Sequence, residues 1–401
     1  MPEIRTVRDH DEFSRAVGAI GQYFSPPPGP EMLERFGQIL PEERVHAAFD
    51  GGEIVGGAGA FPLDFSVPGG SLRCGGVTIV GVLPTHRRRG VLRGLMDAQL
   101  RDLHEREEPL AALWASEETI YGRFGYGRAS WMGALRVPRE WNAFAQPLER
   151  RGTTRFVTPD EAFDLFPPVW EAVRRRRTGM FARTDDWWRL RRLRLPQEEA
   201  SSPRRFVALE IDGQTQAYAI YRTFFEMEDS VSKSRLVVAE ALGSTPQATA
   251  EIWRFLLDVD WMAVTETTLA PPDHPLFFLL ATPRRARYRF VDALWVRLVD
   301  VGAALSGRAY GGDGRLVLEV RDDTCEWNDG RWLLEDGACT RTDAEPDLAL
   351  EASALGAAYL GAVSFRQLWE ALRVEELKDG AIDRADALFT WRPHPWCPEI
   401  F

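Results

Sequence analysis

The chain has 401 residues, of which 45% are hydrophobic and 27% are charged, a composition typical of a soluble globular protein with two or three domains. Its formal net charge of −11 argues against general binding to nucleic acid. No apolar stretch approaches membrane-spanning length, and the amino terminus lacks the pattern of a signal peptide. We therefore expect a cytoplasmic protein with neither a nucleic-acid partner nor a membrane partner.

The cysteines and histidines form no metal-binding or disulfide pattern. The six histidines are scattered, and the four cysteines are far apart, with no C-x-x-C pair: Cys74, Cys325, Cys339 and Cys397. Short spacings between such residues are typical of zinc sites and of disulfide frameworks. The sequence therefore predicts no metal and a reducing environment.

The first region, residues 1–145, has the pattern of antiparallel hairpins followed by a strand–helix–strand unit. Glycine-rich turns separate the apolar runs, and the spacing of apolar residues then changes from that of a strand to that of a helix. The expected elements are two strands in 45–67, a strand at 71–82, a helix from Arg88 that ends before Pro109, and strands at 110–115 and 129–137.

The second region, residues 146–289, partly repeats this plan. A linker is expected at 141–158, across the start of this region. The turn between its strand and helix, residues 243–246, has no arginines and no matching glycine pattern, so the unit resembles a copy that has lost an anion-binding loop. The expected elements are a helix at 159–176, a hairpin around 212–213, a strand at 235–242, a helix at 247–259 and a strand at 263–269.

The third region, residues 290–401, mixes strands and helices and ends in WRPHPWCPEIF. Three prolines and three aromatic residues in this tail favour a docked, extended end over a frayed one. The expected elements are strands at 316–320, 331–334 and 348–351, and helices at 352–360, 365–373 and 381–389.

The junction VTIVGVLPTHRRRGVLR, residues 77–93, is the candidate functional motif. At a strand-to-helix turn the first free N–H groups and the positive end of the helix dipole point at one place, so an anion binds there. Gly90 allows a phosphate to approach the backbone. The spacing is neither G-x-G-x-x-G nor a Walker A loop. These residues predict a site for an anion such as a phosphate, and an arginine-rich, solvent-exposed helix cap is the alternative.

The same residues carry a family resemblance. V-x-V-x-P-x-x-R-R-R-G-x-x-R opening a helix resembles motif A of the GNAT N-acetyltransferases. More narrowly, LPTHRRRGVLR (83–93) and ASEETIYGRFGYG (115–127) resemble the Eis (enhanced intracellular survival) group. The resemblance implies an acetyl-CoA-dependent N-acetyltransferase with an α+β fold. It also implies three domains: two GNAT-like mixed-sheet regions at 1–145 and 146–289, and a sterol-carrier-like domain at 290–401.

The resemblance also assigns the cofactor contacts. Strand-edge pairing with the pantetheine amides maps onto Val80, Gly81 and Val82. Pyrophosphate binding at the helix start maps onto Arg88, Arg89, Gly90, Val91, Leu92 and Arg93. Contacts after the next strand map onto Ser116 and Glu117.

For the chemistry, the resemblance places the general acid at Tyr126, since a phenol with a pKa near ~10 can protonate a thiolate as it forms. It places the general base at the α-carboxylate of Phe401. A tyrosine packed in a turn is the alternative for Tyr126.

The acceptor implied by the resemblance is a small-molecule amine, of the aminoglycoside type. Phe24, Phe36 and Glu399 are positional candidates for the lining of its pocket, and the run Pro26–Pro28 is expected to alter the shape of that pocket. The resemblance further implies a homo-hexamer built as a trimer of dimers.

Two other functions remain open from the sequence. One is a carrier of a hydrophobic ligand, bound in a tunnel in the third region. The candidates for the lining of this tunnel are Leu360, Phe365, Leu368 and Trp369. The alternative is that these residues form the core of the domain. The other is a sensor that binds acetyl-CoA without acetyl transfer.

Overall fold

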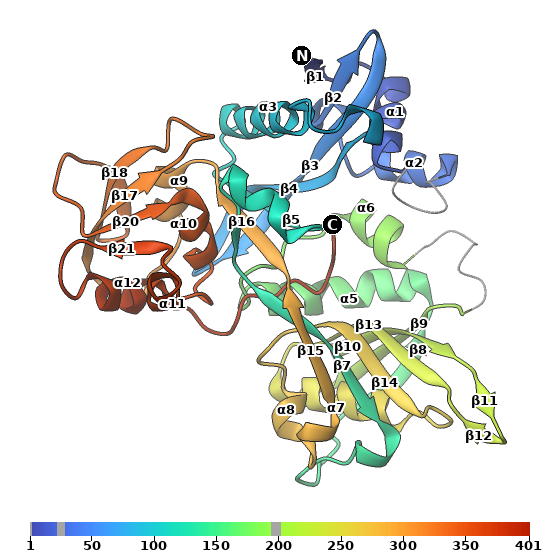
Figure 1. Cartoon of the computed structure of the whole chain (residues 1–401). Coiled ribbons are helices and arrows are strands. Elements are labelled where there is room, and N and C mark those ends of the chain that lie inside the picture. Colours follow the sequence, from blue (N-terminus) through green and yellow to red (C-terminus); the bar gives the residue numbers. More distant parts are fainter. Residues whose placement is uncertain (1, 22–28, 194–201) are drawn as a thin grey trace. The chain divides into compact units, whose positions relative to one another are not determined.

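The structure, a computed structural model, divides the chain into two compact units (Figure 1). The described residues are 2–21, 29–193 and 202–401. The first unit comprises residues 1–130, 293–395 and 400–401, and the second comprises residues 131–292 and 396–399. Each unit therefore collects segments that are distant in the sequence.

The first unit is built on a mixed sheet with the strand order β1-β2-β3-β4-β5-β16-β6. Its strands are β1 (Glu3–Thr6), β2 (Val45–Asp50), β3 (Glu53–Val67), β4 (Gly70–Val82), β5 (Leu110–Trp114), β16 (Leu294–Leu298) and β6 (Gly127–Arg128). Its helices are α1 (His10–Gly21), α2 (Pro30–Gly37), α3 (Val91–Glu105) and α4 (Glu118–Tyr121). Neighbouring strands are antiparallel except for β4 and β5, which are parallel.

Two helices cover the two faces of this sheet, as the alternation of strand residues requires. A methyl group added at Gly56 of β3 would meet Leu95 of α3, whereas one added at Gly57 would lie 2.7 Å from the carbonyl oxygen of Ala16 in α1. Figure 1 shows α3 running across β2 and β3. Glycine in β3 thus lets both helices pack closely onto the strand that adjoins β4.

The rest of the first unit is a smaller α+β region. Its sheet has the order β19-β18-β17-β20-β21, with β17 and β20 parallel. Its strands are β17 (Arg315–Arg321), β18 (Gly330–Glu335), β19 (Ala338–Arg341), β20 (Leu348–Glu351) and β21 (Val374–Glu376). Its helices are α9 (Val301–Ser306), α10 (Ala352–Ala358), α11 (Phe365–Glu370) and α12 (Ala381–Phe389).

The second unit repeats the arrangement of the first sheet, in the order β8-β9-β10-β13-β14-β7-β15. Its strands are β7 (Trp131–Pro138), β8 (Thr153–Val157), β9 (Arg205–Ile211), β10 (Gln214–Phe224), β13 (Arg235–Gly243), β14 (Val264–Ala270) and β15 (Arg287–Asp292), with a hairpin of β11 (Met227–Glu228) and β12 (Val231–Ser232). Its helices are α5 (Pro159–Arg174), α6 (Asp185–Trp187), α7 (Pro246–Asp258) and α8 (Leu276–Leu279).

Helices again cover both faces of this sheet. Successive residues of β10 alternate between two hydrophobic clusters, since Tyr218 packs with Trp170 of α5 and Ala219 packs with Ile252 of α7. β13 and β14 form the parallel pair. The two sheets therefore share strand order, the position of the parallel pair and the helix that joins its strands.

The architecture confirms the predicted α+β fold class, and most predicted elements are present at nearly the predicted positions. The predicted linker at 141–158 contains an edge strand, β8, which pairs with β9. The predicted domain limits at 145/146 and 289/290 stay predictions. The compact units divide near 130/131 and 292/293, because β7 completes the second sheet while β16 completes the first.

Candidate functional site

The candidate site lies where β4 and β5 part. The two strands pair from Cys74 opposite Leu110 to Gly76 opposite Ala112, and in the described structure they are not paired with each other beyond that point. β4 continues to Val82 and pairs with β3 on its other side. The edge of β4 that faces away from β3 therefore does not pair with β5 beyond Gly76, and the predicted pantetheine contacts Val80, Gly81 and Val82 lie in this part of the strand.

A bulge bends β4 at this opening. The register with β3 shifts between Gly57 and Gly59, and Ile79 opposite the shift has a φ of 50°. A β-branched residue with positive φ is strained, and such strain is found at functional sites more often than elsewhere. Bulges bend the strand and redirect its neighbours. The bulge therefore turns the end of β4 away from β5, immediately before the predicted anion loop.

The helix that follows begins with uncapped amides. Gly90 is the N-cap of α3 with φ 81° and ψ 0°, and among the described residues no side chain accepts a hydrogen bond from this helix start. Val91 is the first helical residue, and the N–H groups of the first turn have no partner within the helix. Together with the helix dipole they form a site for an anion. The residues present thus fit a diphosphate.

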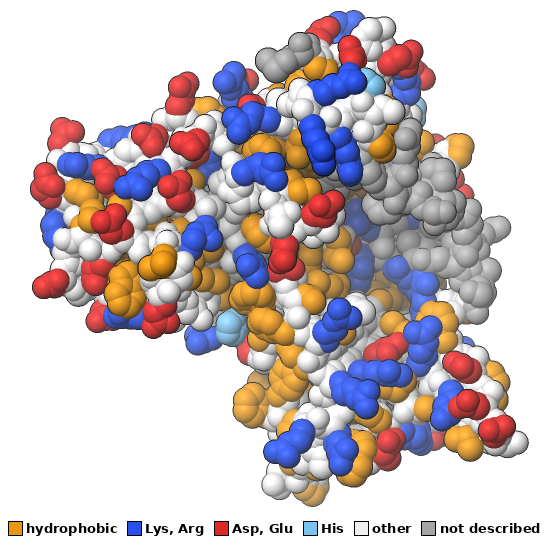
Figure 2. Space-filling view, in the orientation of Figure 1, with side chains coloured by type: hydrophobic (Ala, Val, Ile, Leu, Met, Phe, Trp, Pro, Cys, Tyr) orange, Lys and Arg blue, Asp and Glu red, His pale blue; other side chains and the backbone are white. Residues whose placement is uncertain are grey.

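Arginine side chains surround this helix start. The predicted contacts Arg88, Arg89 and Arg93 are all exposed, and Arg88 has a φ of 62°. Figure 2 shows basic side chains gathered on the surface around α3. One carboxylate balances part of this charge, because Asp50 lies 3.9 Å from the guanidinium of Arg89. The loop is therefore basic and open to solvent, as a site for a polyanion requires.

The predicted acid, Tyr126, is buried beside the opening. It is fully buried and packs in one cluster with Val77 of β4 and Leu113 of β5, the residues just beyond the last paired positions. Within the described ranges its hydroxyl group has no hydrogen-bond partner. Burial raises the pKa of Tyr126 well above its usual value, and the guanidinium of Arg297 opposes this only in part. The phenol is therefore protonated at neutral pH and can act as a proton donor.

Arg297 is a candidate that the sequence did not single out. Its side chain is fully buried in β16 and donates a hydrogen bond of 2.5 Å to the carboxylate of Asp322. A methyl group added at Gly125 would lie 2.6 Å from Cζ of Arg297, so the guanidinium rests against the backbone next to Tyr126. An arginine within the apolar run Leu294–Leu298 was the available signal, since a buried charge requires a partner.

The predicted base, Phe401, lies at the bottom of the opening. It is 7% exposed, and a methyl group added at Gly76 would lie 3.3 Å from Cδ2 of its ring. Gly76 is the last residue of β4 that pairs with β5. Phe401 thus lies against the last paired residue of β4, and Tyr126 belongs to the cluster that contains the next residue of that strand, Val77.

The remaining predicted contacts are scattered. Ser116 and Glu117 are exposed and follow β5, with Glu117 as the N-cap of α4. Phe24 and Pro26–Pro28 lie outside the described residues. Phe36 is half-buried in α2 and packs edge-on against Phe61, with 5.4 Å between ring centroids. Ser116, Glu117 and Phe36 stay predictions.

Glu399, the third predicted pocket residue, is 3% exposed and belongs to the second unit. Its carboxylate accepts a hydrogen bond of 2.8 Å from Nε of Arg183. It also lies 3.8 Å from the guanidinium of Arg192. Its role as a substrate contact stays a prediction.

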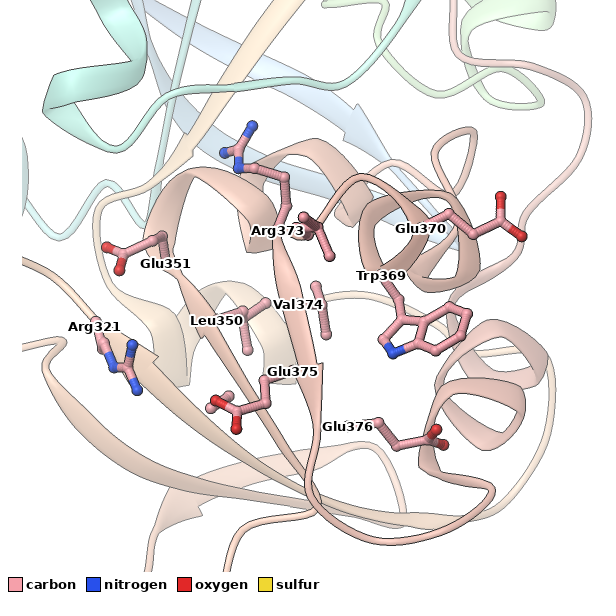
Figure 3. Close-up of a pocket in the computed structure, with 11 residues that line it drawn as sticks. Arg321, Leu350, Glu351, Trp369, Glu370, Arg373, Val374, Glu375 and Glu376 are labelled. Carbon is pink, nitrogen blue, oxygen red and sulfur yellow. The ribbon is translucent and has the colours of Figure 1, made fainter.

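A cavity of about 760 Å³ lies in the smaller α+β region and is lined by β20, β21 and the end of α11 (Figure 3). Four glutamates and two arginines line it: Glu351, Glu370, Glu375, Glu376, Arg321 and Arg373. Of the predicted tunnel residues, Trp369 lines this cavity, whereas Leu360, Phe365 and Leu368 are buried in the core. A lining this rich in charge does not fit an apolar ligand.

In the part of the chain that the structure describes, no helix is long and apolar enough to cross a membrane. No group of three or more His, Cys, Asp or Glu side chains in the same residues is placed to hold a metal ion.

A mixed sheet whose parallel strands part beside an uncapped helix start defines a GNAT-type acetyltransferase module. Comparison with known families agrees, because models described as "Acetyltransferase (GNAT) domain" match residues 3–129 and 179–298. A model described as "Sterol carrier protein domain" matches residues 301–398.

Full-length relatives narrow the class. An uncharacterized N-acetyltransferase from Streptomyces avermitilis is 38% identical over 98% of this chain and 96% of its own. N-acetyltransferase Eis from Mycobacterium tuberculosis is 33% identical over 90% of each chain. The crystal structure of Eis1 from Mycobacterium abscessus superposes with a TM-score of 0.87 at 31% identity, over 100% of each chain. The chain belongs to the Eis family of GNAT N-acetyltransferases, which use acetyl-CoA.

Proposed function

We propose that the protein transfers the acetyl group of acetyl-CoA directly to an amine of a small polycationic molecule of the aminoglycoside type, within a ternary complex. The observation that supports this proposal is that the first unit contains parting strands β4 and β5, an uncapped start of α3, and both Tyr126 and Phe401 close to the last paired residues of β4 and β5.

Binding of the cofactor would use main-chain groups more than side chains. The amides of Gly90, Val91, Leu92 and Arg93 would hold the diphosphate, with Arg88 and Arg89 adding positive charge. The edge of β4 that is not paired with β5 would pair with the pantetheine amides at Val80 and Gly81, as an added strand pairs with a sheet edge, and Val82 is proposed as a neighbouring contact. Ser116 and Glu117 are proposed as further contacts.

The acetyl thioester of the cofactor supplies an activated carbonyl carbon. In the proposed reaction the amine nitrogen forms a bond to that carbon, and the bond from the carbon to sulfur breaks. The α-carboxylate of Phe401 accepts a proton from the attacking nitrogen, and the hydroxyl of Tyr126 donates its proton to the departing sulfur. The protons balance, because one is taken from the amine and one is given to the thiolate.

The nature of the acceptor rests on the family resemblance and on the excess of acidic residues, which suits a cationic substrate. Phe36 is proposed to line the acceptor pocket, and Phe24 lies outside the described residues. We also propose a cytoplasmic homo-hexamer, a trimer of dimers, which native mass spectrometry of the purified protein tests directly.

The test is release of free thiol from acetyl-CoA in the presence of aminoglycosides, compared with the same enzyme carrying a short extension after Phe401. The extension moves the carboxylate away from residue 401 without altering any side chain. We expect turnover with aminoglycosides to fall at least 100-fold in the extended enzyme, while acetyl-CoA binding measured by calorimetry is unchanged. Full turnover after extension would remove Phe401 as the base, and binding without any thiol release would favour a sensor.

A further inference from the structure

The second unit has the same strand opening as the first. β13 and β14 pair from Arg235 opposite Val264 to Val238 opposite Thr267, although β13 continues to Gly243 and β14 continues to Ala270. The relation of β13 to β14 thus matches that of β4 to β5. A second opening of the kind that holds a cofactor in the first sheet therefore exists in the second.

The helix start beside this second opening is closed to anions. Thr245 is the N-cap of α7, and its hydroxyl accepts a hydrogen bond of 3.1 Å from the N–H of Ala248. Pro246, the first helical residue, has no N–H to offer. Gly90 of the first unit provides no such cap. The second opening therefore offers an anion fewer free donors than the first.

The chain's own C-terminal segment, residues Trp396–Glu399, fills the second opening. Trp396 and Pro398 line it together with residues of β13 and β14, and the cavity that remains is about 10 Å³, room for one water molecule at most. The indole Nε1 of Trp396 donates a hydrogen bond of 2.5 Å to the carbonyl of Leu269, in the part of β14 that is not paired with β13. The segment thus hydrogen-bonds a strand end that its neighbour β13 leaves unpaired.

Contacts outside the strands hold the same tryptophan. The main-chain N–H of Trp396 donates a hydrogen bond of 2.8 Å to the carbonyl of Thr178, and the guanidinium of Arg177 lies 5.3 Å from the centre of its ring. Arg177 is itself paired with Asp273. Trp396 is therefore held at its backbone, its ring nitrogen and its ring face.

Three residues further on, Glu399 enters a fully buried charge cluster. Arg183 is completely buried and pairs at 2.6 Å with Glu240 and at 2.7 Å with Glu399. Its guanidinium stacks on Trp170, with 3.3 Å between Cζ and the ring centroid. Tyr218 donates a hydrogen bond of 2.5 Å to Glu240. Because Arg183 is fixed on several sides, it is a rigid anchor for the carboxylate of Glu399.

We propose that the opening between β13 and β14 is a docking site for the C-terminal segment, and that Trp396, Arg183 and Glu399 are positioning residues for Phe401. The second part rests on the proposed function, in which Phe401 supplies the base. Two residues of extended chain reach about 7 Å, so a fixed Glu399 confines Phe401 to a small volume. The pairing of Glu399 with Arg183 fits this role better than contact with an amine.

The experiment compares Trp396→Ala with the matched control Trp261→Ala, since Trp261 is a 64% exposed tryptophan of the same unit. Hydrogen–deuterium exchange on the full chain reports the protection of residues 390–401, calorimetry reports acetyl-CoA affinity, and thiol release reports kcat. For Trp396→Ala we expect at least 10-fold faster exchange in this segment and at least 10-fold lower kcat, with acetyl-CoA affinity within 2-fold. The control should change none of these.

Each outcome decides one part of the proposal. Unchanged exchange in Trp396→Ala would overturn the docking site, and faster exchange with unchanged kcat would overturn the positioning role. If Trp396→Ala does not fold, Trp396→Phe, which keeps the ring and loses the hydrogen bond to Leu269, gives the same comparison. If the enzyme extended after Phe401 keeps full turnover, the proposed base fails, while the exchange measurement still decides the docking site.

Discussion

Replacement of Tyr126 by phenylalanine should separate catalysis from stability. The Tyr126 side chain is fully buried, and its hydroxyl has no hydrogen-bond partner among the described residues. An unsatisfied buried polar group costs about 1–3 kcal/mol. Tyr126→Phe removes that group and keeps the ring, so we expect the free energy of unfolding to stay equal or to rise by about 1 kcal/mol. For a unit of this size that corresponds to an increase in Tm of about 2–4 °C.

The rate should move in the opposite direction. A positioned general acid contributes about 10²–10⁴-fold to the rate, which is about 3–5 kcal/mol of barrier. We therefore expect kcat for thiol release to fall by that factor while the melting temperature is equal or higher. The ordinary result of a core substitution is a loss of stability, so this combination identifies a hydroxyl that is present for chemistry.

The control is Tyr359→Phe. Tyr359 is also fully buried, but its hydroxyl donates a hydrogen bond of 2.9 Å to the carbonyl of Ala304. This variant should lose about 1 kcal/mol of stability and keep its kcat. A lower melting temperature for Tyr126→Phe would mean that its hydroxyl is satisfied, and turnover within 3-fold of the parent would remove it as the acid.

Three further predictions follow from the geometry of single residues. Gly90→Asp places a carboxylate at the start of α3, where it should repel a bound anion. We expect it to weaken acetyl-CoA binding, measured by calorimetry, roughly 10-fold relative to the control Gly90→Ala, which shares the backbone strain. Equal affinities of the two variants would contradict the anion site. Gly125→Ala forces a methyl group against Arg297 at a φ of 79° and should cost more than about 2 kcal/mol in thermal unfolding. Burial opposes charge on Glu240, but Arg183 and other partners lower its pKa from 4.5 to about 2. The stabilisation that Glu240 provides is complete above pH 4.5 and lost as the pH falls through 2, on the order of 3 kcal/mol, and Glu240→Gln should flatten this acid-induced loss in unfolding measurements.

The sequence was most informative where local rules decide the structure. The change in hydrophobic spacing at the junction located the strand and the helix. The helix begins at Val91, whereas the spacing predicted a start at Arg88, because Gly90 with its positive φ cannot be part of an α-helix. Local patterns therefore place an element within a few residues, and the cap decides its first residue.

Such local rules could not predict contacts between residues that are distant in the sequence. Glu399 pairs with Arg183, which is 216 residues away, and no spacing in the sequence connects them. Likewise, the strand at 131–138 read correctly as a strand, but its sheet is fixed by β14 and β15, which come more than a hundred residues later. These pairings depend on which surfaces of the folded chain come into contact. The periodicity of the sequence does not predict those contacts.

The exchange of strands between the two sheets has a consequence for synthesis. β5 is an unpaired edge on one side until β16 is made, and at typical ribosomal rates that delay is roughly 10 to 40 s. Contacts so distant in sequence also slow folding, because a long loop must close first. The nascent chain therefore exposes an aggregation-prone apolar strand, LAALW, during this interval. We expect overproduction at lower temperature or with added chaperones to raise the yield of active enzyme.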